Sequence, residues 1–468
     1  MLFSSITFLF YFLPLTIISW IICHKNIKIA NILLLIFSLI FYAWGEITFV
    51  LVILCSILLN YFLGRLIHLS LIKKLILSPQ LILFISLLIN LSVLIYFKYI
   101  IFIITNISLI FNIHLTAPNV TLPLGISFFT FQVIGYLVDI YKKEIQPTKN
   151  PINFALYLCF FPQLIAGPII RYKDISHQIT NRSISRANFS SGIETFIIGL
   201  AKKVIIANTL GSINTTILND YSNDLTPALV ILAILSHTIQ FYFDFSGYSN
   251  MAIGLGRIFG FHIKENFNYP YIATSISDFW RRWHISLGEF FKHYVYIPLG
   301  GSRKGNFRTY LNLSIVFILC GLWHGANYIF IIWGLYFGFF IVLERLFLSK
   351  LLNKIHSILQ TFYALIVIIL GRAIFMSKDI THFLVLIKSL FYSSNKNSIH
   401  LYWTQNIYFI LIFIISIFGC TPIFNKFFLS SNNKYISFLK NIYYIILLIL
   451  SIAFLAGSTF NPFLYFRF

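Results

Sequence analysis

The chain has 468 residues, of which 59% are hydrophobic and 10% are charged, and its mean hydropathy is +0.86. A soluble protein of this length cannot bury so much apolar surface, because a single core stops growing at roughly 250–300 residues. The composition therefore excludes soluble globular, disordered, collagen-like and disulfide-rich secreted proteins, and it predicts an all-α polytopic membrane protein.

The charge is strongly basic, since 34 Lys and Arg residues against 13 Asp and Glu residues give a formal net charge of +21. The basic residues lie between apolar runs, where such residues set topology and attract anionic lipid headgroups. We therefore expect membrane lipids, and not nucleic acid, as partners. The five cysteines form no C-x-x-C pair, so neither a metal site nor a disulfide framework is expected.

About ten apolar runs approach the ~20 residues that a membrane span requires, and about 10–12 transmembrane helices are expected. The clearest runs are 4–23, 29–44, 48–66, 81–97, 228–245, 310–323, 328–343, 361–375, 407–419 and 443–455. Lys25 and Lys28 follow the first run and Glu46 follows the second. The positive-inside rule therefore places the N-terminus outside.

The middle of the chain differs from its two ends. Pro, Gly and charged residues interrupt the apolar runs there, as in Ala166-Gly-Pro168. Non-helical backbone at membrane depth is tolerated only inside protein or beside a water-filled cavity. We expect re-entrant and interfacial helices around a central tunnel. This divides the chain into N-terminal transmembrane helices (1–117), a core of broken and amphipathic helices (118–345) and C-terminal transmembrane helices (346–468).

The first candidate for chemistry is the sequence GLWHGAN, at the junction of two apolar runs. Gly321 and Gly325 form a G-x-x-x-G pair, which lets another helix backbone approach closely. If the helix continues, Asn327 and Tyr328 share the face of His324 and can fix its tautomer, as a general base requires. The residues alone leave open whether His324 is such a base or a structural histidine of the core.

The second candidate, residues 278–294, is too polar to span a membrane and too aromatic for an ordinary loop. A single helix would pair Asp278 with Arg282 and form an apolar stripe of Phe279, Trp283, Leu287 and Phe290. An interfacial amphipathic helix fits this pattern. His284 then either faces a cavity and assists a transfer reaction, or belongs to a peripheral structural helix.

A basic group follows, made up of Arg281, Arg282, Lys292, Arg303, Lys304 and Arg308. Gly300 and Gly301 could expose backbone N–H groups beside it. Such a group suits the phosphates of a nucleotide-bearing donor, although a positive-inside loop has the same composition.

Asp244 ends a strongly apolar run and must be paired or protonated there. We expect it to brace a buried Arg or His, and we interpret Asp139 in the same way.

Several longer segments then support a family assignment, namely 161–171, 244–254, 265–271, 278–287, 296–301 and 321–325. With them the chain resembles the membrane-bound O-acyltransferases, within the bacterial branch of alginate and peptidoglycan O-acetyltransferases. Teichoic-acid D-alanyl transfer proteins share the two histidine motifs.

The resemblance implies acyl transfer across the bacterial inner membrane, from a cytoplasmic donor expected to be acetyl-CoA. The acceptor would be a cell-envelope polysaccharide, reached directly or through a periplasmic acetyltransferase partner protein. The resemblance assigns the catalytic roles to His324 and His284. Supporting roles would fall to Trp323, Asn327, Tyr328 and Asp244, and donor binding to Arg281, Arg282, Lys292, Arg303 and Lys304.

The sequence departs from the family pattern at two places. Lys292-His-Tyr294 stands where the family usually has Arg-Asp-Tyr, and Asn250 stands where it usually has an acid. The first departure bears on donor or partner contacts more than on the chemistry, because both histidines remain. D-alanyl or other acyl transfer stays an alternative, as does a transporter for a small anion or a glycan, which broken helices would also suit.

Overall fold

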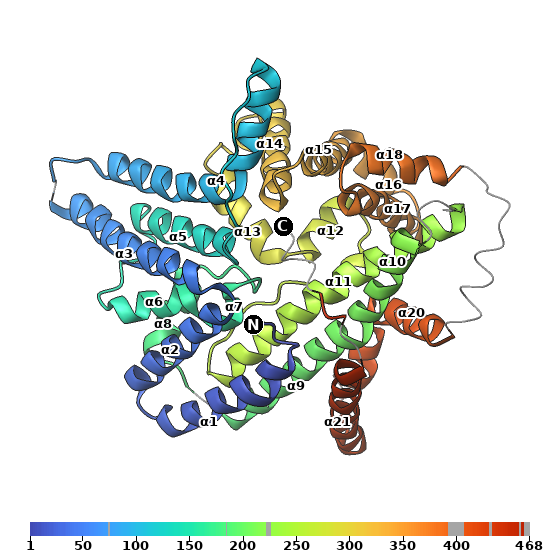
Figure 1. Cartoon of the computed structure of the whole chain (residues 1–468), viewed down its shortest axis with the longest axis horizontal. Helices are drawn as coiled ribbons and strands as arrows, with labels where there is room; N and C mark the ends of the chain where they lie inside the picture. The colour runs from blue at the N-terminus through green and yellow to red at the C-terminus, as the bar shows by residue number, and fades with distance from the viewer. Residues whose placement is uncertain are drawn as a thin grey trace. The chain divides into compact units, whose positions relative to one another are not determined.

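The computed structural model describes the chain except residues 74, 184, 221–225, 392–406, 430–432, 458–459 and 463–468. All regular elements among the described residues are helical (Figure 1), which confirms the all-α prediction. Within the part of the chain that the structure describes, seven helical stretches are long and apolar enough to cross a membrane. They are 27–73, 79–111, 186–218, 227–258, 328–352, 357–376 and 435–457. The same described residues include four shorter apolar helices, at 8–23, 126–141, 380–389 and 408–419.

The apolar faces of several spans are turned outward. Only 11% of the most apolar window is buried in each of two stretches, 79–111 and 435–457. A folded protein in water rarely exposes so large an apolar surface, whereas such a surface is stable in contact with the hydrocarbon of a bilayer. The exposed apolar surface is therefore the lipid-facing surface of a multi-pass membrane protein.

The chain folds as two compact units, and the boundary between them passes through two helices, α9 and α11. The first unit consists of residues 1–196 and 252–264. Its helices are η1 (Phe8–Phe12), α1 (Leu13–Cys23), α2 (Ile27–Glu46), η2 (Ile47–Phe49), α3 (Val50–Lys73), α4 (Pro79–Phe111), α5 (Ile126–Tyr141), α6 (Pro151–Cys159), α7 (Phe161–Leu164), α8 (Tyr172–Thr180) and most of α9 (Arg186–Ala201).

The broken segment of the first unit is enclosed by protein, as the sequence predicts. Residues 160–170 are all buried. The Phe161 ring packs on those of Phe12 and Phe41 at centroid distances of 5.5 and 5.4 Å. Asp139 is buried and pairs with Arg171 at 3.0 Å, so its predicted bracing role is confirmed.

The second unit consists of residues 197–251 and 265–468. Its helices are η3 (Lys202–Ala207), α10 (Asn208–Asp220), most of α11 (Pro227–Ile258), η4 (Pro270–Ile272), α12 (Ile276–Arg282), α13 (Ile285–Phe291), η5 (Lys292–Tyr296), α14 (Asn306–His324), α15 (Tyr328–Leu343), η6 (Glu344–Leu348), α16 (Ser349–Leu352), α17 (Ser357–Met376), α18 (Ile380–Ser389), α20 (Ile407–Gly419), η7 (Asn425–Leu429) and α21 (Lys434–Gly457). Within this unit α14 packs along α15, and α15 and α18 both contact α17 (Figure 1).

Glycine permits the close packing of α14 on α15. A Cβ atom added at Gly321 would collide with the carbonyl oxygen of Phe330, and one added at Gly334 would collide with that of Phe317. The backbone approach that the G-x-x-x-G pair predicts is therefore present at Gly321. It fixes the end of α14, where His324 lies.

Candidate active site

Two short helices, rather than the single amphipathic helix expected, carry the second histidine motif. α12 ends at Arg282 and α13 begins at Ile285. His284 lies between them with φ 45° and ψ 55°, a left-handed conformation that a non-glycine residue rarely adopts. The predicted pairing of Asp278 with Arg282 is confirmed at 2.9 Å. The break turns His284 into the interior, where it is 2% exposed.

Asn266 stabilises this turn. Its backbone carbonyl accepts a hydrogen bond from the Ile285 N–H at 3.0 Å. Its side-chain Oδ1 accepts from the N–H and the hydroxyl of Ser286, at 3.0 and 2.9 Å. Nδ1 of His284 is 3.3 Å from the same Oδ1. Because the Ser286 N–H can only donate, Oδ1 is the acceptor, and Nδ1 of His284 must carry the proton.

The lone pair of His284 is therefore on Nε2. Burial lowers the pKa of His284 to about 3, from about 6.5 for an exposed imidazole. The ring is thus neutral at physiological pH. Its Nε2 can accept a proton or a hydrogen bond, but it cannot donate one in this state.

His324 is the last residue of α14 and is 5% exposed. Aromatic rings contact its imidazole edge to face, with centroid distances of 4.9 Å to Trp323, 4.9 Å to Trp333 and 5.1 Å to Phe375. Gly325 is extended, at φ −172°, and ends the helix. The imidazole therefore projects from a helix end into an aromatic enclosure.

Trp323 contacts both imidazoles. Its ring centroid lies 5.9 Å from that of His284 and 4.9 Å from that of His324. The structure thus brings together the two histidines and the tryptophan that the sequence proposes for one site.

Asn327 and Tyr328 do not continue the helix of His324, because that helix ends before them. Asn327 is the N-cap of α15, where its side chain accepts from the Ile329 N–H at 3.1 Å and donates to the Lys378 carbonyl at 3.0 Å. Tyr328 is 52% exposed. Asn327 and Tyr328 therefore do not share a helix face with His324, contrary to the prediction for a continuous helix. Asn327 caps α15 instead.

Asp244 forms an ion pair with Lys203 at 2.8 Å, and both side chains are 3% exposed. Lys203 Nζ also donates to Oδ1 of Asn208 at 2.8 Å and to the carbonyl oxygen of Pro462. The prediction of Arg or His as the partner of Asp244 was wrong, since the partner is a lysine. A bracing role fits this buried network. Nearby in the sequence, Asn250 accepts from Lys202 at 2.9 Å, where an acid would form an ion pair.

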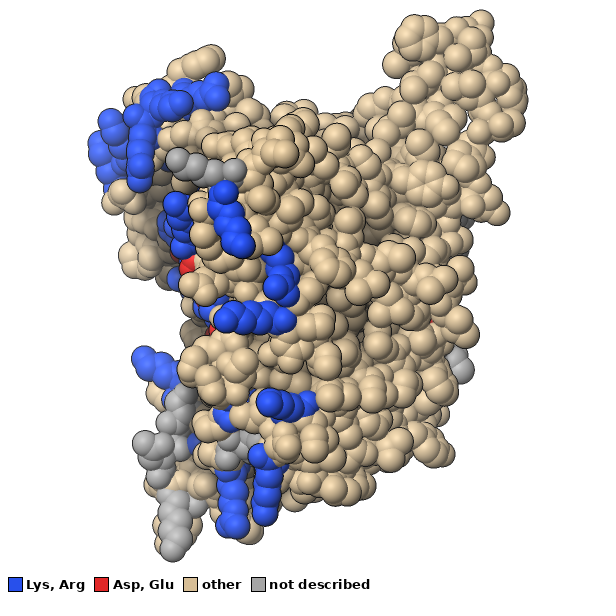
Figure 2. Space-filling view, turned by 90° about the vertical axis from the view of Figure 1, so that its left-hand side faces the viewer, with Lys and Arg blue, Asp and Glu red and all other residues tan. Residues whose placement is uncertain are grey.

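The five basic residues proposed to bind the donor divide into two sets. Arg281 and Arg282 both hydrogen-bond Asp278, and Arg282 also donates to the Asn268 carbonyl. The other set, Lys292, Arg303 and Lys304, is exposed. Figure 2 shows Lys and Arg side chains gathered along one side of the face in view. The expectation that Gly300 and Gly301 expose their N–H groups was wrong, because both donate within a turn at 2.9 Å.

Two buried charged residues near the site were not predicted from the sequence. Glu344 is 1% exposed and accepts from the N–H groups of Ile276 and Ser277, at 2.5 and 2.9 Å, and so holds the start of α12. Arg372 lies on α17 and is 5% exposed. The signal for Arg372 was available, since it is one charge within an apolar run. Asn266 was also missed as a partner of His284, although it lies in a quoted segment.

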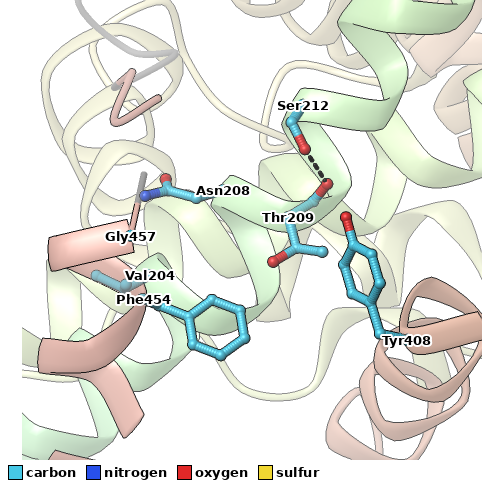
Figure 3. A pocket seen from close by; sticks show the side chains of 7 residues that line it. All are labelled: Val204, Asn208, Thr209, Ser212, Tyr408, Phe454 and Gly457. Carbon is cyan, nitrogen blue, oxygen red and sulfur yellow. Dashed lines mark hydrogen bonds between the residues drawn. The ribbon is translucent and has the colours of Figure 1, made fainter. Parts of the chain in front are cut away.

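A cavity of about 290 Å³ lies elsewhere in the second unit (Figure 3). Its lining residues are Val204, Asn208, Thr209, Ser212, Tyr408, Phe454 and Gly457. Neither histidine lines it. Asn208, which accepts from Lys203, connects it to the ion pair of Asp244.

Residues 141–377 match the model of MBOAT, the membrane-bound O-acyltransferase family. The probable alginate O-acetylase AlgI of Pseudomonas aeruginosa is 36% identical over 389 residues, which cover 81% of this chain and 73% of the relative. The peptidoglycan O-acetyltransferase of Helicobacter pylori is 33% identical, over 83% of this chain and 80% of the relative. The teichoic acid D-alanyltransferase of Bacillus subtilis is 31% identical over 48% of this chain and 59% of the relative.

The matched region contains α12, α13, α14 and the helices that enclose both imidazoles. The chain belongs to the membrane-bound O-acyltransferase family and is an acyltransferase.

Proposed function

We propose that this protein transfers an acetyl group from a cytoplasmic thioester donor, acetyl-CoA, to a cell-envelope polysaccharide of the alginate or peptidoglycan type. The observation that carries the proposal is the contact of Trp323 with both His284 and His324. Both imidazoles are buried and adjoin the same indole ring, which supports a shared role for them. The names of the relatives support acetyl as the group transferred.

His324 acts as the general base in this proposal. An acceptor hydroxyl attacks the thioester carbonyl carbon, its proton passes to His324, and the carbonyl electron pair moves to oxygen. When the tetrahedral intermediate collapses, the C–S bond breaks and the thiolate takes the proton from the imidazolium. The acetyl ester and the free thiol are the products.

His284 orients the acceptor hydroxyl. Its Nδ1 proton is directed to Asn266, so Nε2 carries a lone pair and accepts hydrogen bonds. A neutral ring of this tautomer cannot donate to an oxyanion from Nε2. Its role is therefore to receive the O–H of the acceptor and aim the oxygen at the donor.

The donor side is cytoplasmic in this proposal, with the N-terminus outside and the protein in the bacterial inner membrane. Lys292, Arg303 and Lys304 are exposed and suit the phosphates of the donor. Arg281 and Arg282 contribute less, because Asp278 neutralises part of their charge. A periplasmic partner protein receives the acetyl group and passes it to the polymer, or the polymer hydroxyl attacks directly.

The test uses membrane vesicles with labelled acetyl-CoA and the isolated envelope polysaccharide. His324→Ala should lower acetyl transfer at least about 10²-fold, the scale of general base catalysis, while the protein still inserts and stays monodisperse in detergent. His262→Ala, at an exposed histidine, is the matched control and should keep wild-type transfer. Acetylation near the wild-type rate in a folded His324→Ala protein would refute the mechanism.

The D-alanyltransferase relative favours a second candidate, transfer of D-alanine to an envelope polymer. The bond chemistry at His324 is the same, and only the acyl group and its carrier differ. Mass spectrometry of the envelope polymer from cells with and without the protein distinguishes them, because an acetyl ester and a D-alanyl ester differ in mass.

A further inference from the structure

Arg372 is a buried cation within the apolar span of α17. Its guanidinium carbon lies 3.8 Å from the ring centroid of Phe241, 4.8 Å from that of Trp283 and 5.1 Å from that of Phe375. It also hydrogen-bonds the Tyr271 side chain. Charges at membrane depth are costly and usually functional, so a role for this one is expected.

The Phe375 ring joins Arg372 to His324. The ring centroid is 5.1 Å from the guanidinium carbon and 5.1 Å from the imidazole centroid. The positive charge therefore lies within about 10 Å of the imidazole, in a region of low dielectric constant. Protonation of His324 would place a second positive charge close to the first.

Three aromatic rings enclose His324 and keep water away from it, so a charge within about 10 Å acts on the imidazole with little screening. A general base must be neutral before it can accept a proton. We propose that Arg372 is a positioning residue that holds His324 in its neutral, proton-accepting form. This inference rests on the proposed function and adds a residue to its mechanism.

The other titratable and charged groups of the surrounding helices do not replace Arg372. The turn between α12 and α13 contributes His284, whose ring is neutral. Helix α11 contributes His237 and η4 contributes Tyr271, and neither residue supplies a negative charge. From α15 the ring of Trp333, which does not titrate, contacts the imidazole of His324.

Three buried or half-buried carboxylates of this unit have other partners among the described residues. Asp278 of α12 pairs with Arg282, and Glu344 of η6 accepts from the start of α12. Asp244 of α11 pairs with Lys203. Arg372 therefore supplies the positive charge that opposes protonation of His324 from the α17 side.

The expected size follows from Coulomb's law. At an effective dielectric constant of about 20, a charge ~10 Å away changes the proton-binding constant of the imidazole roughly tenfold. Removing the charge should therefore move the acid limb of the pH dependence of kcat/KM to higher pH by about one unit. A purely structural role would lower activity or stability without moving that limb.

The experiment measures acetyl transfer by membrane vesicles between about pH 5 and 8 with saturating and limiting acetyl-CoA. Arg372→Gln removes the charge but keeps a planar group for stacking and hydrogen bonding. Arg372→Met is a second neutral variant, with a different shape. Arg372→Lys keeps the charge. Arg345→Gln is the matched control, because Arg345 is exposed. The neutral variants should shift the acid limb, and the Lys variant and the control should not.

A wild-type acid limb in a folded neutral variant would overturn the inference. So would failure of both neutral variants to fold while Arg372→Lys folds, because the charge would then serve the fold. If wild-type vesicles transfer no acetyl group at all, the proposed function itself fails, and that result is distinct from an unshifted limb.

Discussion

His284 and His324 contact the same indole ring, that of Trp323, although they are 40 positions apart in the sequence. Their ring centroids lie 5.9 and 4.9 Å from the indole centroid. The two imidazoles are therefore no more than about 11 Å apart. This proximity suits two distinct roles at one site, one orienting and one accepting a proton.

Trp323 should matter for turnover because it sets that separation. Trp323→Ala removes the shared contact surface, and we expect acetyl transfer to fall about tenfold to a hundredfold, as for a small displacement of catalytic groups. Trp323→Phe keeps an aromatic ring and should lose less. Trp44→Phe, at a residue that is 63% exposed, is the control and should behave as wild type. Equal rates for Trp323→Ala and wild type would contradict this account.

Asn266 should control which nitrogen of His284 is protonated. Asn266→Leu removes the acceptor of the Nδ1 proton and should lower kcat about tenfold to a hundredfold. Asn266→Asp keeps an oxygen acceptor and should restore part of the activity. The measurement is steady-state transfer with each folded variant. If the Leu and Asp variants are equally impaired, the tautomer argument is wrong and only the packing of Asn266 matters.

Glu344 should stabilise the segment that carries His284. Glu344→Gln replaces one of the two accepting oxygens with an NH2 donor, which leaves the N–H of Ile276 or that of Ser277 unsatisfied at a cost of about 1–3 kcal/mol. We expect a lower thermal midpoint in detergent and reduced transfer. The exposed Glu265→Gln is the matched control. An unchanged midpoint for Glu344→Gln would show that the start of α12 does not depend on this carboxylate.

Any side chain at Gly321 should lower the stability of the protein. Gly321→Ala drives a Cβ atom into the Phe330 carbonyl and should cost about 1–3 kcal/mol through overpacking between α14 and α15. Gly45→Ala introduces the same atom where its nearest neighbour would be 3.7 Å away, and it should be neutral. Thermal unfolding of the two variants in the same detergent makes the comparison. Equal stability of both would mean that the two helices separate without cost.

Acidification should destabilise the protein through His284. Its pKa is about 3 in the folded protein and about 6.5 when exposed, so the unfolded chain binds the proton more tightly. Stability from this group is complete above about pH 6.5 and falls progressively as the pH drops towards 3. The thermal midpoint of wild type should therefore fall more between pH 7 and 5 than that of His284→Gln. Parallel pH dependences would contradict a buried neutral imidazole.

The sequence by itself determined the class of the protein. A hydrophobic fraction of 59% and long apolar runs permit only helical spans, because backbone groups in hydrocarbon must bond within their own segment. The family pattern also indicated His284, His324 and Trp323. The pairing of Asp139 with Arg171 and the close approach at Gly321 follow from local rules about buried charge and small residues. The division into three segments and the central tunnel stay predictions.

Only the tertiary structure decided how the site is assembled. The break of the helix at His284 depends on Asn266, which is 18 residues away and could not be identified from periodicity. The lysine partner of Asp244 and the aromatic enclosure of Arg372 likewise come from other helices. Local patterns report which residues share a face of one helix. They do not report which distant segment brings an acceptor, a charge or a ring to that face, because that depends on packing among all the helices.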